Sequence, residues 1–167
     1  MDHINDMWDL NPDNAHPKAR QLLTDPLYWD FGDEESPLGT DRGADTLSAY
    51  IRYRLKSPMG TVADFLRAEL ESLGLPDSEW DLVDEGLIEE AIRSGRGRRI
   101  TTRDDFIMGM AFAQIVLQGE VDKVVSRHAQ HAISREATNA VLAFRGWDNE
   151  EGRREQLSEM RRILELA

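Results

Sequence analysis

The sequence contains no cysteine, which excludes disulfide bonds, thiol catalysis and zinc sites built on thiolates. It has no apolar run near the roughly 18 residues that a membrane-spanning helix needs, so no membrane partner is expected. The opening residues, MDHINDMWDL, lack the basic and apolar regions of a secretory signal. These absences together predict a cytoplasmic protein.

Basic residues are also scarce, with 20 Lys and Arg against 32 Asp and Glu and a net charge of −12. Because attraction to phosphate dominates nonspecific nucleic-acid binding, this balance excludes nucleic acid as an expected partner. The imbalance is concentrated in residues 1–45, which hold eleven acids and three basic residues, a net of −8. Such a region would attract a basic protein by long-range electrostatics.

The familiar catalytic signatures are missing. There is no Walker loop, no GxGxxG, no GxSxG and no HExxH. We therefore expect no catalytic residue, no cofactor and no metal ligand set. The favoured function is that of a non-catalytic helical protein, regulatory or immunity-type, that binds another protein.

An alternative function comes from helical carboxylates. Asp84, Glu85, Glu89 and Glu90 lie about one helical turn apart, as in all-α pyrophosphohydrolases that bind magnesium. A metal-dependent hydrolase would need further acids to meet them in one cleft. Asp104 and Asp105 could serve, although we interpret both as solvated residues in the first turn of a helix, where the dipole favours acids.

The fold is expected to be all-α. A length of 167 residues indicates one domain over 1–167, with residues 1–15 left open as a flexible stretch. Helical periodicity predicts an irregular bundle of about seven helices. The expected helices cover 17–23, 46–56, 62–73 with Thr61 as its cap, 79–94, about 103–118, 120–145 and a last helix beginning after 148.

Two helical stretches stand out. Residues 106–117, FIMGMAFAQIVL, are apolar on nearly all sides, so we expect 103–118 to be a central helix surrounded by others. In 120–145 the apolar face changes direction between its two halves. A straight helix cannot bury both faces against one neighbour, so we predict a break near 133–134 with Ser134 as the second cap.

Residues 27–46, LYWDFGDEESPLGTDRGADT, form an acidic, glycine-rich loop. We expect it to be ordered, with its aromatics and Leu38 packed on the bundle and Asp45 capping the next helix. Its acids can bind a partner, bind a cation, or lie in water while the glycines form turns. The candidate partner-binding residues are Asp30, Asp33, Glu34, Glu35, Asp41 and Trp29.

Two smaller groups of residues leave alternatives open. Residues 93–103 hold five arginines, and Arg96, Arg98 and Arg99 can bind an anion or belong to a soluble connection. His128 and His131 have a spacing that suits a metal, but a third ligand would have to come from elsewhere. We interpret His128 as a buried, hydrogen-bonded histidine because it lies on an apolar stripe.

One segment resembles a known group. Residues 16–47, HPKARQLLTDPLYWDFGDEESPLGTDRGADTL, resemble uncharacterised bacterial proteins of the YfeS/MolR-like group, which carry HPKA…LL…FFW…D…SPFGSD.G.DTL. Leu38 stands where that phrase has Phe. The rest of the chain is similar to small acidic helical domains of unknown function. The resemblance implies a non-secreted bacterial protein close to regulators and immunity systems, and it brings no catalytic residue.

Overall fold

A computed structural model describes residues 10–75 and 79–167, and within these ranges there is no β-strand. The predicted all-α class is confirmed. The α-helices are α1 (Pro17–Leu22), α2 (Asp41–Lys56), α3 (Val62–Ser72), α4 (Glu85–Arg93), α5 (Gly97–Gln118), α6 (Lys123–Glu136), α7 (Asn139–Arg145) and α8 (Glu150–Leu166). Two short 3-10 turns, η1 (Pro12–Asn14) and η2 (Pro26–Trp29), flank α1. In the described residues, no helix is both long enough and apolar enough to cross a bilayer.

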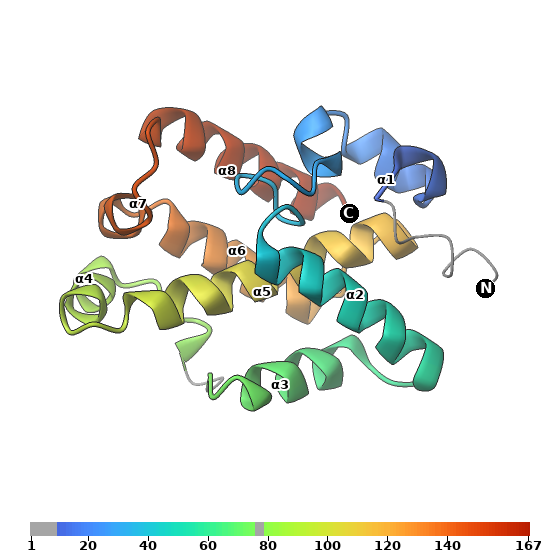
Figure 1. The fold of residues 1–167 in the computed structure, drawn as a ribbon, viewed down its shortest axis with the longest axis horizontal. Helices are drawn as coiled ribbons and strands as arrows, with labels where there is room; N and C mark the ends of the chain where they lie inside the picture. The colour runs from blue at the N-terminus through green and yellow to red at the C-terminus, as the bar shows by residue number, and fades with distance from the viewer. Residues whose placement is uncertain (1–9, 76–78) are drawn as a thin grey trace.

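Helix α5 runs through the middle of the molecule (Figure 1) and packs against α1, α2, α3, α4, α6 and α7. Every residue from Phe106 to Val116 is buried, which follows from a surface with no polar face. The helix begins at Gly97, six residues before the expected start at 103. Of the arginine-rich residues 93–103, those from 97 onward are therefore helical rather than part of a connection.

The crossing of α2 over α5 depends on two glycines. A Cβ on Gly109 would lie 2.9 Å from the Gly43 Cα, and a Cβ on Gly43 would collide with the Pro37 carbonyl oxygen. Their missing side chains let the two helix backbones approach closely. The prediction that Asp45 caps α2 was wrong, because the helix begins at Asp41 and the Thr40 hydroxyl accepts from the Gly43 N–H at 2.9 Å.

Two other helix boundaries differ from the expectation. Helix α4 starts at Glu85 rather than 79, with Asp84 as its cap, and Leu87 in its first turn is half exposed. The chain breaks at Ala137–Thr138 rather than near 133–134. The Ser134 hydroxyl donates to the Gln130 carbonyl inside α6, and Thr138 is the cap of α7.

The periphery forms two groups. Helices α4 and α7 pack together at one end around a small cluster that includes Ile88, Ile100 and Val141. Helix α1 lies near the end of α8 (Figure 1), where Lys18 Nζ donates to the Ala167 carbonyl at 3.0 Å. The flexibility expected for residues 1–15 falls partly on 1–9, outside the described residues. Among the described residues 10–15, Leu10 and Ala15 are buried.

Candidate functional site

The acidic segment lies between α2 and α8 (Figure 1), and its Tyr28 and Leu38 side chains belong to the core. The expectation that its aromatics all pack on the bundle was wrong for Phe31, which is 37% exposed. Tyr28 stacks on Phe112 of α5 with ring centroids 5.5 Å apart, and Leu38 is fully buried. The Trp29 indole is half-buried and donates to the Leu23 carbonyl at 2.8 Å. Trp29 therefore serves the packing of this segment, and most of its surface is not free for a partner.

Three of the candidate acids hold the segment in shape. Asp30 accepts from the Gly32 N–H at 2.7 Å, and Asp33 accepts from the Glu35 N–H at 2.9 Å. Both are side-chain turns of the kind that Asp favours. The Glu35 carboxylate accepts from Gln156 of α8, and its carbonyl accepts from Arg153 at 2.6 Å. These contacts give Asp30, Asp33 and Glu35 structural roles.

The other two candidates, Glu34 and Asp41, line an open cleft of about 540 Å³ together with Asp45. We call this the acidic cleft. Because α2 begins at Asp41, Asp41 and Asp45 are one helical turn apart on the same face. All three carboxylates are exposed, and within the described part of the chain none makes an ion pair or a side-chain hydrogen bond to another side chain. The same cleft is also lined by Arg42, Arg98, Phe144, Arg145 and Trp147, so it holds basic and aromatic side chains beside the acids.

A largely buried arginine network borders the acidic cleft, and its Asp105, Arg145 and Trp147 line it. Arg145 bridges Asp105 at 2.7 Å and Glu136 at 2.7 Å, and the Trp147 indole donates to Glu136 at 3.2 Å. Arg153 stacks on the Trp147 ring, 4.8 Å from its centroid. Although burial opposes the guanidinium charge, the carboxylates of Glu136 and Asp105 raise the pKa of Arg145. The network holds these lining residues in place.

The three candidate anion-binding arginines do not converge. Successive residues on a helix are about 100° apart, so Arg98 faces the acidic cleft while Arg99 faces another side. Arg96 and Arg99 line a second cavity of about 180 Å³ with Arg103, and Glu79 and Glu90 line it too. Arg103 Nη1 donates to the Glu79 carboxylate at 3.0 Å. Arg99 donates to the Gly74 carbonyl at 3.1 Å. Arg103 is fully buried, and its Nη2 makes no hydrogen bond within the described residues.

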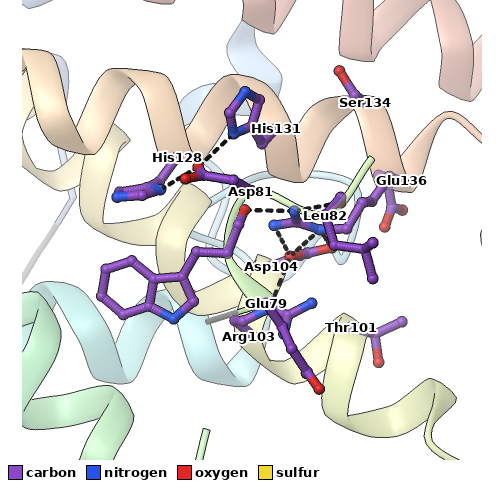
Figure 2. Close-up of polar contacts among 12 residues, drawn as sticks. Glu79, Asp81, Leu82, Thr101, Arg103, Asp104, His128, His131, Ser134 and Glu136 are labelled. Atoms are coloured by element: carbon purple, nitrogen blue, oxygen red, sulfur yellow. Dashed lines mark hydrogen bonds and ion pairs between the residues drawn. The ribbon is translucent and has the colours of Figure 1, made fainter. Parts of the chain in front are cut away.

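Asp104 is fully buried, so its interpretation as a solvated first-turn residue was wrong. Arg135 of α6 clamps it, with Nη2–Oδ1 at 2.8 Å and Nε–Oδ2 at 3.1 Å (Figure 2). Burial raises the pKa of the Asp104 carboxyl, and the Arg135 guanidinium opposes that rise. Asp105 is likewise drawn inward by Arg145. Sequence reasoning did not single out Arg135 or Glu136, since polar residues on a helix are expected to face water.

Arg135 also hydrogen-bonds to the backbone of the segment before α4. Its Nη1 donates to the Trp80 carbonyl at 2.6 Å and to the Leu82 carbonyl at 2.9 Å. Asp81, between them, points to the two histidines of α6 (Figure 2). Its Oδ1 lies 2.8 Å from His131 Nδ1 and 3.2 Å from His128 Nδ1.

His128 is buried, as interpreted from its apolar stripe, but the expected hydrogen bond is not made. The distance from its Nδ1 to Asp81 is short, yet the direction is unsuitable, so this atom has no hydrogen bond in the described structure.

The helical carboxylates of the alternative function do not meet the other acids. Asp84 accepts from the Leu87 N–H at 3.0 Å as the cap of α4. Glu85 and Glu89 are exposed on α4, where Glu89 approaches Arg93 at 3.9 Å. Asp104 lies inside, bound to Arg135. A two-metal hydrolase needs these groups around one cleft, and they are dispersed.

Comparison with known proteins found a curated relative described as "Uncharacterized protein YfeS" from Escherichia coli (strain K12), 29% identical over 137 residues. The match covers 80% of this chain and 54% of the relative, so the chain spans about half of that protein's length. Neither a protein-family model nor a solved structure matches. The chain is related to the YfeS group of uncharacterised proteins, as its segment 16–47 suggested.

Proposed function

We propose that this chain is a non-catalytic helical protein that binds a basic protein partner at the acidic cleft. The observation that carries the proposal is the grouping of three exposed carboxylates, Glu34, Asp41 and Asp45, on one wall of an open cleft. Exposed Phe144 and partly exposed Trp147 line the same cleft and add apolar area. Aromatic side chains beside charged groups are common at protein contacts.

The chemistry of the cleft indicates what the partner presents. Lysine or arginine side chains would pair with the α2 wall, and long-range attraction to the acidic surface would speed their approach. Arg98, which is exposed and lines the same cleft, would donate to an acid of the partner. A partner surface with several basic residues and one neighbouring acid therefore fits the cleft better than a uniformly basic one.

The buried networks support a scaffold rather than a reaction centre. Asp104, Asp105 and Glu136 are each held by arginine. Carboxylates committed in this way orient the helices that form the cleft. The carboxylates of Glu34, Asp41 and Asp45 have no such arginine and line the cleft, where a second protein can reach them.

The test begins with affinity capture from the native host and identification of the partner by mass spectrometry. Association rates with that purified partner are then measured at several salt concentrations. The variant Glu34→Gln/Asp41→Asn/Asp45→Asn should slow association at low salt, because it removes the carboxylates that attract a basic partner. The difference from the wild type should shrink at physiological ionic strength, where exposed charges are already screened beyond about 8 Å. Asp33 and Glu35 are left unchanged, since both hold the backbone.

The matched control is Glu85→Gln/Glu89→Gln/Glu90→Gln, which removes the same charge from exposed positions on α4. It should slow association much less than the cleft variant. Equal slowing by both triple variants would show a general charge effect without a site. An unchanged rate for the cleft variant at low salt would overturn the proposal.

A second function, binding of a small anion, is proposed for the cavity where Arg96, Arg99 and Arg103 lie beside Glu79 and Glu90. The unpartnered Nη2 of buried Arg103 favours it, because a buried donor needs an acceptor. Titration with inorganic phosphate, followed by NMR of the arginine side chains, should saturate. Arg99→Met should weaken the binding, whereas Arg93→Met, on exposed α4, should not. Equal binding by both variants would refute this function.

A further inference from the structure

We infer that Asp81, His128 and His131 form a binding site for a divalent transition metal of the zinc class. The inference does not depend on the acidic cleft. Two imidazole nitrogens and one carboxylate oxygen, each from a different side chain, lie within 4.8 Å of one another. This is a common donor set for zinc, with three protein ligands and one open position.

The two histidines come from one helix face. His128 and His131 are three residues apart on α6, so their rings lie side by side over one turn. Both direct Nδ1 toward Asp81 Oδ1, at 3.2 and 2.8 Å. Ligand atoms around a tetrahedral zinc ion, with bonds of about 2.0–2.2 Å, are about 3.3–3.5 Å apart. The two Nδ1–Oδ1 distances are slightly shorter than this spacing, and all three ligand atoms lie within 4.8 Å of one another, so they can converge on one ion.

His128 supplies a second, independent observation. Its side chain is only 7% exposed, and its Nδ1 makes no hydrogen bond within the described residues although it faces the Asp81 carboxylate. Buried polar atoms in folded proteins normally have a partner. Both imidazoles compete for one carboxylate oxygen, and a bound cation would satisfy all three ligand atoms together.

The ligand loop is held in place before any ion arrives. Arg135 donates to the carbonyls of Trp80 and Leu82, on either side of Asp81. The Trp80 ring meets the His128 ring edge-on, with centroids 4.7 Å apart. Helix α6 therefore supplies both imidazoles (Figure 2) and the arginine that holds the loop carrying Asp81. Such outer contacts orient metal ligands in known sites.

The donor chemistry selects the kind of ion. Imidazole suits zinc, copper and nickel, whereas magnesium and calcium prefer a shell of oxygen ligands. The Asp81 side chain is 60% exposed and that of His131 is 31% exposed, so the open coordination position faces solvent. Water would occupy it, or a side chain from another protein.

Untagged full-length protein, stripped with chelator, is titrated with Zn²⁺ by calorimetry and with Co²⁺ by visible spectroscopy. We expect one ion per chain, with strong cobalt bands typical of tetrahedral coordination. An excess of Mg²⁺ should not compete. Asp81→Asn and His131→Ala should each weaken Zn²⁺ binding more than about 100-fold, because losing an outer-shell partner alone costs about 10–100-fold.

The matched control is His16→Asn, which removes another histidine whose Nδ1 caps α1, a position that asparagine also suits. It should bind Zn²⁺ as the wild type does. Asp81 is exposed, so Asp81→Asn should keep the wild-type circular dichroism spectrum. Absence of a one-to-one cobalt spectrum, or equal Zn²⁺ affinity in Asp81→Asn and wild type, would overturn the inference.

Discussion

Arg135 and Asp104 form a fully buried ion pair that ties α6 to α5, with both side chains closed to solvent. Nε contacts Asp104 Oδ1 at 3.0 Å and Oδ2 at 3.1 Å, and Nη2 contacts Oδ1 at 2.8 Å. With its Nη1 on two loop carbonyls, the guanidinium joins three segments of the chain. Removing either member of the pair would leave an uncompensated charge in the interior.

Asp104→Ala should therefore lower the free energy of unfolding by about 3–5 kcal/mol, the usual cost of breaking a buried pair. Urea denaturation followed by circular dichroism measures the change. The control is Glu89→Ala, whose partner Arg93 lies 3.9 Å away at the surface, and it should cost under about 1 kcal/mol. A similar decrease in the free energy of unfolding for both variants would mean that the buried pair stabilises the fold no more than a surface pair does.

A substitution at the α2–α5 crossing should also be costly. Gly109→Ala places a Cβ 2.9 Å from the Gly43 Cα and should cost about 1–3 kcal/mol through overpacking. Elsewhere in a helix the same change is worth about 0.5–1 kcal/mol of stabilisation, so the sign is diagnostic. Gly86→Ala on α4, whose nearest neighbour is the Asp84 side chain at 3.3 Å, should stay within that smaller range. A stabilised Gly109→Ala would contradict the close crossing.

Shortening a core side chain of α5 should lower the overall stability and should also loosen the residues packed against that side chain. Ile115 and Phe112 are 0% and 1% exposed, and replacing either with Ala should cost about 2–5 kcal/mol. Because Phe112 stacks on Tyr28, its loss alone should speed amide exchange in residues 28–38. Leu55→Ala, at a half-exposed position, should change stability by only about 0.5 kcal/mol. Losses below about 1 kcal/mol at both core positions would refute the central packing of α5.

Alkaline pH should loosen the docking of the acidic segment. Burial, reinforced by Glu159 and Asp25, raises the pKa of Tyr28 above its ordinary value. The unfolded chain loses this proton near pH 10 while the folded chain keeps it, so stability falls as the pH rises above about 10. The free energy of unfolding of Tyr28→Phe, measured from pH 8 to 11, should fall less steeply than that of the wild type. Parallel curves for the two proteins would mean that folding does not raise the pKa of Tyr28.

Local signals predicted several helix ends correctly. Thr61 caps α3, its hydroxyl accepting from the Asp64 N–H at 3.1 Å, as the spacing of these residues indicated. The change of apolar face in 120–145 also predicted that the helix is interrupted. The position was wrong because both Ser134 and Thr138 can cap, and only the tertiary packing of α7 decides between them.

The start of α2 and the interior ion pairs could not be predicted. Gly43 looks like a loop residue in the sequence, but it lies in α2, and it is a glycine because the Pro37 carbonyl leaves no room for a side chain. Asp104 looks solvated because its partner Arg135 lies 31 residues away on another helix. Helical periodicity shows which positions face inward, but it does not show which buried charges will meet.

The bond from Arg153 of α8 to the Glu35 carbonyl spans 118 residues. Synthesis begins at the other end of the chain, so the acidic segment leaves the ribosome long before its docking surface exists. Glu34 and its neighbours can take their final positions only after α8 has emerged. Until then, Tyr28 and Leu38 are exposed apolar residues of the kind that aggregate during folding. The dense negative charge around them would keep such nascent chains apart.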